Sequence, residues 1–167
     1  LFRNRVLREL LHKPVDDREL RENVLLSGED PLLTGLISQQ REDGSWGRLS
    51  PLNTTAFSPL TATGQALRLL ALLGYNSQFE PAARGVEYLL SRQQEDGSWP
   101  LENPRDLLEQ NRYSSISLQT SLPLQGLAAL GLSRDEHCEK AYSWLLDQRI
   151  SDGSWPTGRS DKVLGFV

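Results

Sequence analysis

Three residue types that bind zinc stand within four positions of one another: Asp135, His137 and Cys138. A helix turns by about 100° per residue, so residue 137 points about 200° away from residue 135, while residue 138 shares its face. Side chains directed in this way cannot converge on one metal ion. The sequence therefore predicts no metal site and no cofactor, and we interpret the three residues as the start of a helix.

Acidic side chains offer the other candidates for chemistry. Glu102, Asp106 and Glu109 precede an apolar segment that starts at residue 117. Glycoside hydrolysis requires a pair of carboxylates that face one cavity, and this is the one acidic cluster in a suitable place. Asp16-Asp17 near the N-terminus is interpreted as a solvated pair, and His12 as a surface residue instead of a base.

The elements around these residues follow from an internal repeat. The tetrapeptide Asp-Gly-Ser-Trp occurs three times, ending at Trp46, Trp99 and Trp155, at spacings of 53 and 56 residues. Repeats of this length are typical of arrays in which each unit packs on its neighbours. The sequence therefore predicts a repeat architecture.

Helix pairs are expected between the tryptophans. Apolar residues at three- and four-residue steps over 79–90 and 141–148 predict amphipathic helices, whereas 61–74 and 117–131 are apolar on most sides and predict buried ones. Pro81 suits a first turn, Gly97 a helix end, and Ser133 with Glu136 a capping box. No long period-two alternation occurs, so the fold class is all-α.

Residues 1–28 stand apart from the repeats, which we place at 29–167. A first helix is predicted from the apolar residues Leu1, Phe2, Val6, Leu7, Leu10 and Leu11, and we interpret it as a terminal cap of the array. The basic residues of that helix could also suit a membrane surface. Packing against the first repeat is the simpler interpretation.

Each repeat contains a corner made of a glutamine, a glycine and a tryptophan. The glutamine can satisfy carbonyls at a helix end, and the indole adds apolar contact and one N–H donor. We therefore expect a structural role, in joining neighbouring repeats, for the residues of the three corners: Gln40, Gly44, Trp46, Gln93, Gly97, Trp99, Gly153 and Trp155.

The corners carry a resemblance to a known family. The segment 84–99, Arg-Gly-Val-Glu-Tyr-Leu-Leu-Ser-Arg-Gln-Gln-Glu-Asp-Gly-Ser-Trp, resembles the QW motif of squalene-hopene cyclases and oxidosqualene cyclases. The third copy has Arg149 at the glutamine position, and the first has Pro31 and Gly35 where a basic residue and an aromatic belong. The resemblance covers about residues 29–156 and implies an α/α toroid of the terpenoid cyclase and prenyltransferase superfamily, here about half a ring.

The same resemblance implies a catalytic motif that this sequence lacks. Squalene-hopene cyclases protonate an alkene with the middle aspartate of Asp-x-Asp-Asp, and Asp16-Asp17 has no matching first aspartate. We therefore assign no catalytic residue. In a toroid, the loops between a corner and an inner helix rim the cavity, so the candidate rim residues are Asn53, Thr54, Phe57, Tyr113 and Ser114.

Composition excludes several other classes of protein. The net charge is −4, with both signs scattered, so the sequence carries no electrostatic footprint of a nucleic-acid-binding protein. Arg68 interrupts the strongest apolar run, which is too short for a transmembrane helix. A single cysteine, with no visible signal peptide, favours a cytoplasmic protein that could touch a membrane peripherally.

Three functions remain open. The leading hypothesis is a cyclase-like module that binds an isoprenoid or another apolar molecule, with any acid supplied from elsewhere. The alternatives are a non-catalytic helical scaffold for protein contacts and a carbohydrate-active enzyme, since fold does not fix function. The sequence has no methionine and stops soon after Trp155, so we expect either a longer native chain or self-association that covers the open inner face.

Overall fold

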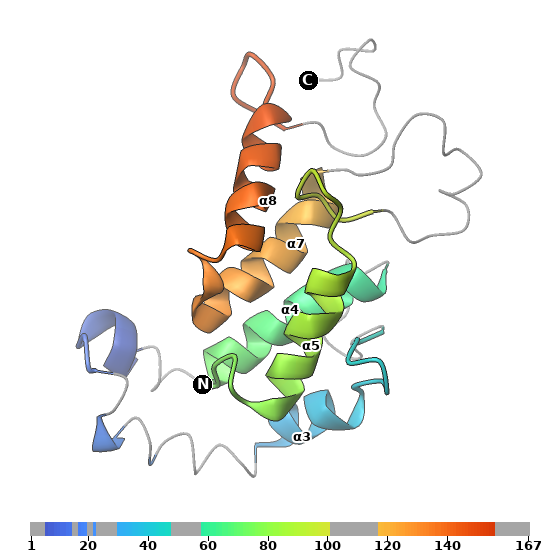
Figure 1. The fold of residues 1–167 in the computed structure, drawn as a ribbon. Coiled ribbons are helices and arrows are strands. Elements are labelled where there is room, and N and C mark those ends of the chain that lie inside the picture. Colours follow the sequence, from blue (N-terminus) through green and yellow to red (C-terminus); the bar gives the residue numbers. More distant parts are fainter. Residues whose placement is uncertain are drawn as a thin grey trace.

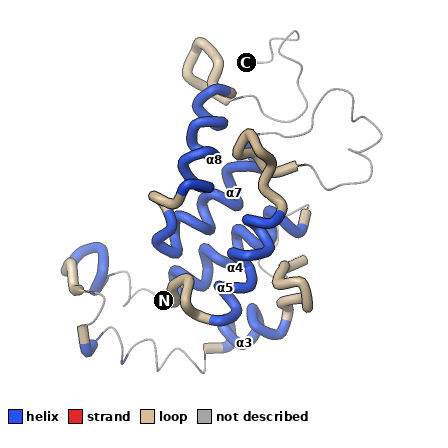
Figure 2. The backbone as a smooth tube through the Cα atoms, viewed as in Figure 1, coloured by secondary structure: helices blue, strands red, loops and turns tan. Residues whose placement is uncertain are grey.

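The structure, a computed structural model, describes residues 6–14, 17–19, 22, 30–47, 58–100 and 117–155. Within these residues Figure 2 shows helices and loops, and the one strand-like feature is an isolated bridge between Gln40 and Trp46. The predicted all-α class is confirmed. The helices are α3 (Pro31–Ser38), α4 (Pro59–Leu73), α5 (Glu80–Ser91), α7 (Ser117–Leu127) and α8 (Glu136–Asp147), with short π-helical turns η1 (Val6–Leu10) and η3 (Ala128–Leu132).

The helices form two layers. α4 and α7 pack against each other and make the inner layer, while α5 packs on α4 and α8 packs on α7 to make the outer layer (Figure 1). α3 contacts α4 at the opposite end of the array from α8. The chain therefore alternates outer and inner helices, as the repeat predicts.

The inner helix α4 is defined by strong signals at both ends. Ser58 and Thr61 form a capping box, in which each side-chain oxygen accepts a hydrogen bond from the other residue's backbone N–H at 3.3 Å. Pro59 fills the first helical position, where its missing N–H costs nothing. Gly74 ends the helix in the left-handed conformation at φ +99°.

Two predictions about the outer helices are wrong. Asp135, not Ser133, caps α8, and its carboxylate accepts the backbone N–H of His137 at 3.0 Å. Gly97 does not end α5, which stops at Ser91. Gly97 lies in the corner that follows, at φ +90°. Ser133 and Gly97 are suitable residue types for a helix start and a helix end. Asp135 lies directly before α8, however, and Arg92 directly after α5, so these two residues take the cap positions.

α4 and α7 meet backbone to backbone. A Cβ atom added at Gly64 would lie 2.6 Å from the carbonyl carbon of Leu122 and 2.7 Å from the nitrogen of Pro123, and one added at Gly126 would strike the backbone of Gly64. Only glycine permits this approach. The core around the contact is apolar, with Leu67, Leu70 and Leu127 fully buried.

The expected N-terminal helix is described only in part. η1 covers Val6–Leu10, where Leu7 is buried and Leu10 is exposed. In the described part of the chain no helix is both long and apolar enough to cross a bilayer.

The glycine contact gives a first prediction. Gly64→Ala should lower the free energy of unfolding by about 2 kcal/mol or more, because the added methyl must separate α4 from α7. A matched control is Gly35→Ala in α3, where the nearest atom to an added Cβ is Gln39 Nε2 at 4.0 Å. That variant should be neutral or up to about 1 kcal/mol more stable, from helix propensity. Urea unfolding of the two variants measures the difference, and equal effects would contradict the backbone contact.

Candidate functional site

The three corners share one local conformation. We define them as corner 1 (39–47), corner 2 (92–100) and corner 3 (148–155). In corner 1 the backbone N–H of Arg41 donates to the carbonyl of Ser45 at 2.8 Å, and that of Gly44 donates to the carbonyl of Arg41 at 3.0 Å. The Asp43 carboxylate accepts from both the N–H and the hydroxyl of Ser45. A glycine with φ between +84° and +90° completes the turn in each corner.

The tryptophans of corners 1 and 2 each join two helices. The Trp46 indole N–H donates to the carbonyl of Leu36 in α3 at 2.7 Å, and the backbone N–H of Trp46 donates to Thr63 Oγ1 in α4 at 2.9 Å. Trp99 does the same with Leu89 of α5 and Thr120 of α7. Both rings are completely buried. The tryptophan therefore fixes the preceding outer helix to the following inner one.

The glutamines of corners 1 and 2 each reach the next outer helix. Gln40 Nε2 donates to the carbonyl of Gly44 in its own corner and to that of Pro81 in the first turn of α5, both at 2.9 Å. We expected the glutamine to satisfy unpaired carbonyls at a helix end. The indole does this instead, at Leu36 and Leu89, and the glutamine amide bridges two repeats.

Backbone contact supports this bridge. A Cβ atom at Gly44 would lie 2.5 Å from the carbonyl oxygen of Arg84 in α5, and one at Gly97 would lie 2.5 Å from that of Lys140 in α8. Arg84 also donates to the carbonyls of Arg41 and Glu42. Gly44 and Gly97 are thus required both for their positive φ and for this close approach.

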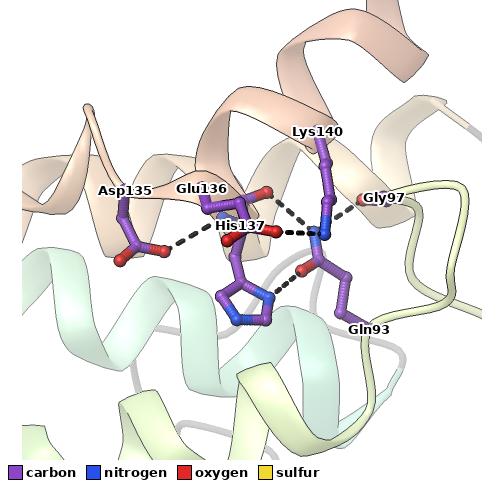
Figure 3. Close-up of polar contacts among 6 residues, drawn as sticks. All are labelled: Gln93, Gly97, Asp135, Glu136, His137 and Lys140. Carbon is purple, nitrogen blue, oxygen red and sulfur yellow. Dashed lines mark hydrogen bonds and ion pairs between the residues drawn. The ribbon is translucent and has the colours of Figure 1, made fainter.

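Corner 2 has an additional contact, shown in Figure 3. Gln93 Nε2 donates to the carbonyls of Gly97 and His137, and Gln93 Oε1 accepts from His137 Nδ1 at 2.7 Å. The glutamine amide thus uses both its donor and its acceptor on α8. Lys140 pairs with Glu136 at 2.6 Å, an exposed pair that adds little stability.

Corner 3 differs because Arg149 replaces the glutamine. Its Nε donates to the carbonyl of Gly153 at 2.9 Å, and its guanidinium lies over the Trp155 ring at 5.5 Å. The Trp155 indole donates to Leu145 of α8 at 2.6 Å. Trp155 remains 41% exposed. Corner 3 is therefore complete within itself, but no following helix covers it among the described residues.

The structure separates the three zinc-binding residue types. The Asp135 carboxylate caps α8, the His137 ring contacts Gln93, and Cys138 is buried in the core. Burial, with a smaller contribution from the Asp135 charge, raises the pKa of the Cys138 thiol to about 11. The thiol is therefore protonated at neutral pH, and no group of metal-binding side chains occurs in the part of the chain described.

Several sequence candidates lie outside the described residues. These are the rim residues Asn53, Thr54, Phe57, Tyr113 and Ser114, the acidic cluster Glu102, Asp106 and Glu109, and Asp16. The neighbouring Asp17 is described. It pairs with Lys13 at 3.2 Å and accepts the backbone N–H of Glu19 at 2.9 Å, which are contacts typical of a helix start.

The inner helices carry a partly exposed stripe whose residues the sequence analysis did not identify. On α4 it includes Leu69 and Leu72, and on α7 Leu118 and Leu122. At about 100° per residue, each pair lies on one side of its helix. Gln65 and Arg68 on α4, and Ser121 and Gln125 on α7, occupy the same sides. We call these eight residues the inner stripe. The apolar character of both helices on most sides conceals it in the sequence.

Comparison with known proteins agrees with these observations. The family model described as "Squalene-hopene cyclase C-terminal domain" matches residues 33–166, most of the chain. A squalene–hopene cyclase of Bradyrhizobium diazoefficiens (strain JCM 10833 / BCRC 13528 / IAM 13628 / NBRC 14792 / USDA 110) is 40% identical over 82 residues. The match covers 42% of this chain and 12% of that relative. It spans far less than two thirds of the relative's length.

The bridging role of the glutamine predicts a stability effect. Gln93→Ala should lower the free energy of unfolding by about 2 kcal/mol, because two carbonyls and the His137 ring lose their partner. Arg149→Ala is the matched control, since Arg149 makes no described bond to a following helix. It should cost less than about 1 kcal/mol. Urea unfolding measures both, and an equal loss would argue against a bridge between repeats.

Corner 1 should respond to acid. Hydrogen bonds from the Ser45 hydroxyl and, to a lesser extent, its backbone N–H lower the pKa of Asp43, with burial acting in the opposite direction. A lowered folded-state pKa stabilises the protein above the ordinary aspartate pKa, and this contribution is lost as the pH falls through the folded-state value. Asp43→Asn should therefore cost about 0.5 kcal/mol at pH 7, because the residue is exposed and screened.

The difference between wild type and Asp43→Asn should vanish near pH 2. Urea unfolding at the two pH values measures it. A difference that does not change with pH would show that the charge of Asp43 is irrelevant to the corner.

Proposed function

The chain belongs to the squalene-hopene cyclase C-terminal domain family, and from this premise we propose that it binds an isoprenoid or another apolar molecule on its inner helices. The printed name of the Bradyrhizobium relative, squalene–hopene cyclase, supports an isoprenoid as the class of ligand. Because the match covers only 12% of that relative, we transfer the kind of ligand and not the reaction.

The observation that supports binding is the inner stripe. Leu118 is 52% exposed, and Leu72 and Leu122 are partly exposed, although all three lie on helices whose other sides are buried. Leaving leucine on a surface gains nothing for folding. Covering the same area with an apolar molecule is favourable, at roughly 25 cal/mol per Å² of surface removed from water.

The polar members of the stripe limit what the ligand can be. Arg68 and Gln125 are exposed on the same sides as the leucines. Both carry side-chain N–H donors, which suit an oxygen atom at one end of an otherwise apolar molecule. We infer that an isoprenoid with a single hydroxyl or a similar polar group fits the stripe better than a pure hydrocarbon.

The chain's own part in this function is binding and shaping. Its sequence contains no Asp-x-Asp-Asp motif. Cyclisation would therefore need an acid from residues beyond this sequence or from another molecule. We further infer that residues 1–28 cap the array and that the protein is cytoplasmic, with peripheral membrane contact as the route by which an apolar ligand arrives.

A non-catalytic scaffold is the second candidate. Its support is the exposed apolar surface at the far end of the array, where Tyr142, Leu146 and Trp155 are each at least 40% exposed. That surface lies on the outer helix α8 and its corner, whereas the inner stripe lies on α4 and α7. The two functions can therefore be tested separately.

Binding can be tested with farnesol, a fifteen-carbon isoprenoid alcohol. We expect farnesol to shift the methyl NMR signals of Leu72, Leu118 and Leu122 in a saturable way. Leu118→Asp should weaken binding about tenfold, because a charge replaces apolar contact area. The matched control is Ile37→Asp, which changes a 41% exposed aliphatic residue on the outer helix α3 and should leave the affinity unchanged.

Two results would contradict the proposal. One is the absence of saturable shifts at the inner stripe. The other is an equal loss of affinity in the two aspartate variants, which would indicate non-specific partitioning of farnesol onto any apolar surface.

A further inference from the structure

The two inner helices hold a single charged residue. Neither α4 nor α7 contains an aspartate, glutamate, lysine or histidine, and the one arginine of the two helices is Arg68 of α4. Arg68 is exposed and belongs to the inner stripe. Among the described residues its side chain makes no hydrogen bond and no ion pair. The inner layer therefore carries a positive charge that no carboxylate of that layer neutralises.

Basic residues of the outer layer have clear structural roles. Arg84 donates to two carbonyls of corner 1. Lys140 forms an ion pair within α8, and Arg149 donates to a carbonyl of corner 3. Arg68 has no such part in joining or closing the repeats, so its position on the inner stripe requires another explanation.

The register of α4 against α7 determines what lies beside the charge. At the start of both helices, Gln119 Nε2 donates to Ser58 Oγ at 2.8 Å. Further along, Gly64 approaches the backbone of α7 between Leu122 and Gly126. The two helices therefore run parallel, and each residue of α4 is level with the residue of α7 about 60 positions later.

Three polar side chains of the stripe come together in this register. Gln65 of α4 is level with Gln125 of α7, and Arg68 lies one turn further along α4. Side chains on a helix lean back toward its N-terminus, which directs the guanidinium toward the level of the two amides. We call Gln65, Arg68 and Gln125 the polar band.

Leucines of the inner stripe lie on both sides of the polar band. Leu118 and Leu122 precede it along the helices, and Leu69 and Leu72 follow its amides. Leu118 lies seven residues before Gln125, which is about 10 Å along the helix. A chain-like apolar molecule that covers either pair of leucines therefore has one end at the polar band.

The charge of Arg68 selects among such molecules. A neutral hydrocarbon lying over the band would remove water from the guanidinium, which costs free energy unless the charge is paired. A phosphate or a carboxylate offsets this cost, because it forms paired, charge-assisted hydrogen bonds with arginine. The exposed amide of Gln125 can donate to a remaining oxygen of the same group.

From these observations we propose that the polar band binds the anionic group, a phosphate or a carboxylate, of an isoprenoid whose chain lies on the leucines of the inner stripe. This inference rests on the proposed function, since it specifies the class of ligand for the same surface. Arg68 supplies the selectivity, and the leucines supply the apolar contact.

The test compares four fifteen-carbon probes that share one chain: farnesyl phosphate, farnesoic acid, farnesol and farnesylamine, each below the concentration at which it forms micelles. Binding to the full chain is followed through the methyl NMR signals of Leu72, Leu118 and Leu122. Both anions should bind about tenfold more tightly than farnesol, as expected for one charge-assisted pair, and farnesylamine should bind more weakly than farnesol. The tighter of the two anions identifies the preferred group.

Variants assign the preference to Arg68. Arg68→Gln should remove the tenfold preference for the anions over farnesol, and Arg68→Glu should make farnesylamine the tightest probe. The matched control is Arg134→Gln, which changes an exposed arginine in the turn before α8 and should keep the preference. Unchanged indole N–H signals of Trp46 and Trp99 show that each variant is folded.

The outcomes separate this inference from the proposed function. If none of the four probes gives saturable shifts, binding on the inner stripe is itself wrong. If all four bind with equal affinity, the stripe binds isoprenoids but the polar band does not select an anion, and another part of the molecule neutralises Arg68. A preference that survives in Arg68→Gln, or inorganic phosphate that binds as tightly as farnesyl phosphate, would also overturn the inference.

Discussion

The close approach of α4 and α7 at Gly64 and Gly126 is the constraint on which the rest of the array depends. With side chains at these positions the inner helices would stand further apart, since each Cβ would enter the backbone of the other helix. Thr63 lies beside Gly64, and its hydroxyl receives the backbone N–H of Trp46. On the next inner helix, α7, the hydroxyl of Thr120 accepts the backbone N–H of Trp99. The spacing of the inner helices therefore sets where both corners are held.

The corners solve a second problem, which is how to bury polar backbone where helices of two layers meet. A buried carbonyl without a partner costs on the order of 1–3 kcal/mol, so each must be matched. One long side chain reaches back and another reaches forward: the indole donates to a carbonyl in the last turn of the helix just ended, and the glutamine donates to a first-turn carbonyl of the outer helix that starts a repeat later. This division explains why a corner needs both residue types, and why Gly-Ser between them must form a tight turn.

Much of the fold could be predicted because its signals are local. The helical periodicity, the proline at the start of α5 and the glycine at the end of α4 act within a few residues of themselves. The partners of Gln40 and Gln93 could not be predicted in this way. They lie 41 and 44 residues away, and the reach of an amide depends on how the layers pack.

The misassigned cap of α8 has a similar origin. Ser133 and Asp135 are both good capping residues, and the choice between them depends on where Gly131 ends the preceding segment, at φ +92°. The residues of the inner stripe could not be predicted because α4 and α7 lack a distinguishing local signal. On a helix that is apolar on most sides, sequence alone does not show which side its neighbours leave uncovered.

Corner 3 shows how far a corner can form without a neighbour. The Asp152 carboxylate accepts the backbone N–H of Ser154, and the Arg149 side chain donates to the carbonyl of Gly153. The Trp155 indole donates to the carbonyl of Leu145, so all three bonds lie within α8 and the turn that follows it. The conformation of corner 3 is therefore held by contacts within α8 and the turn that follows it. The same reasoning explains how a repeat array can grow by one unit at a time, each corner ready before the next helix arrives.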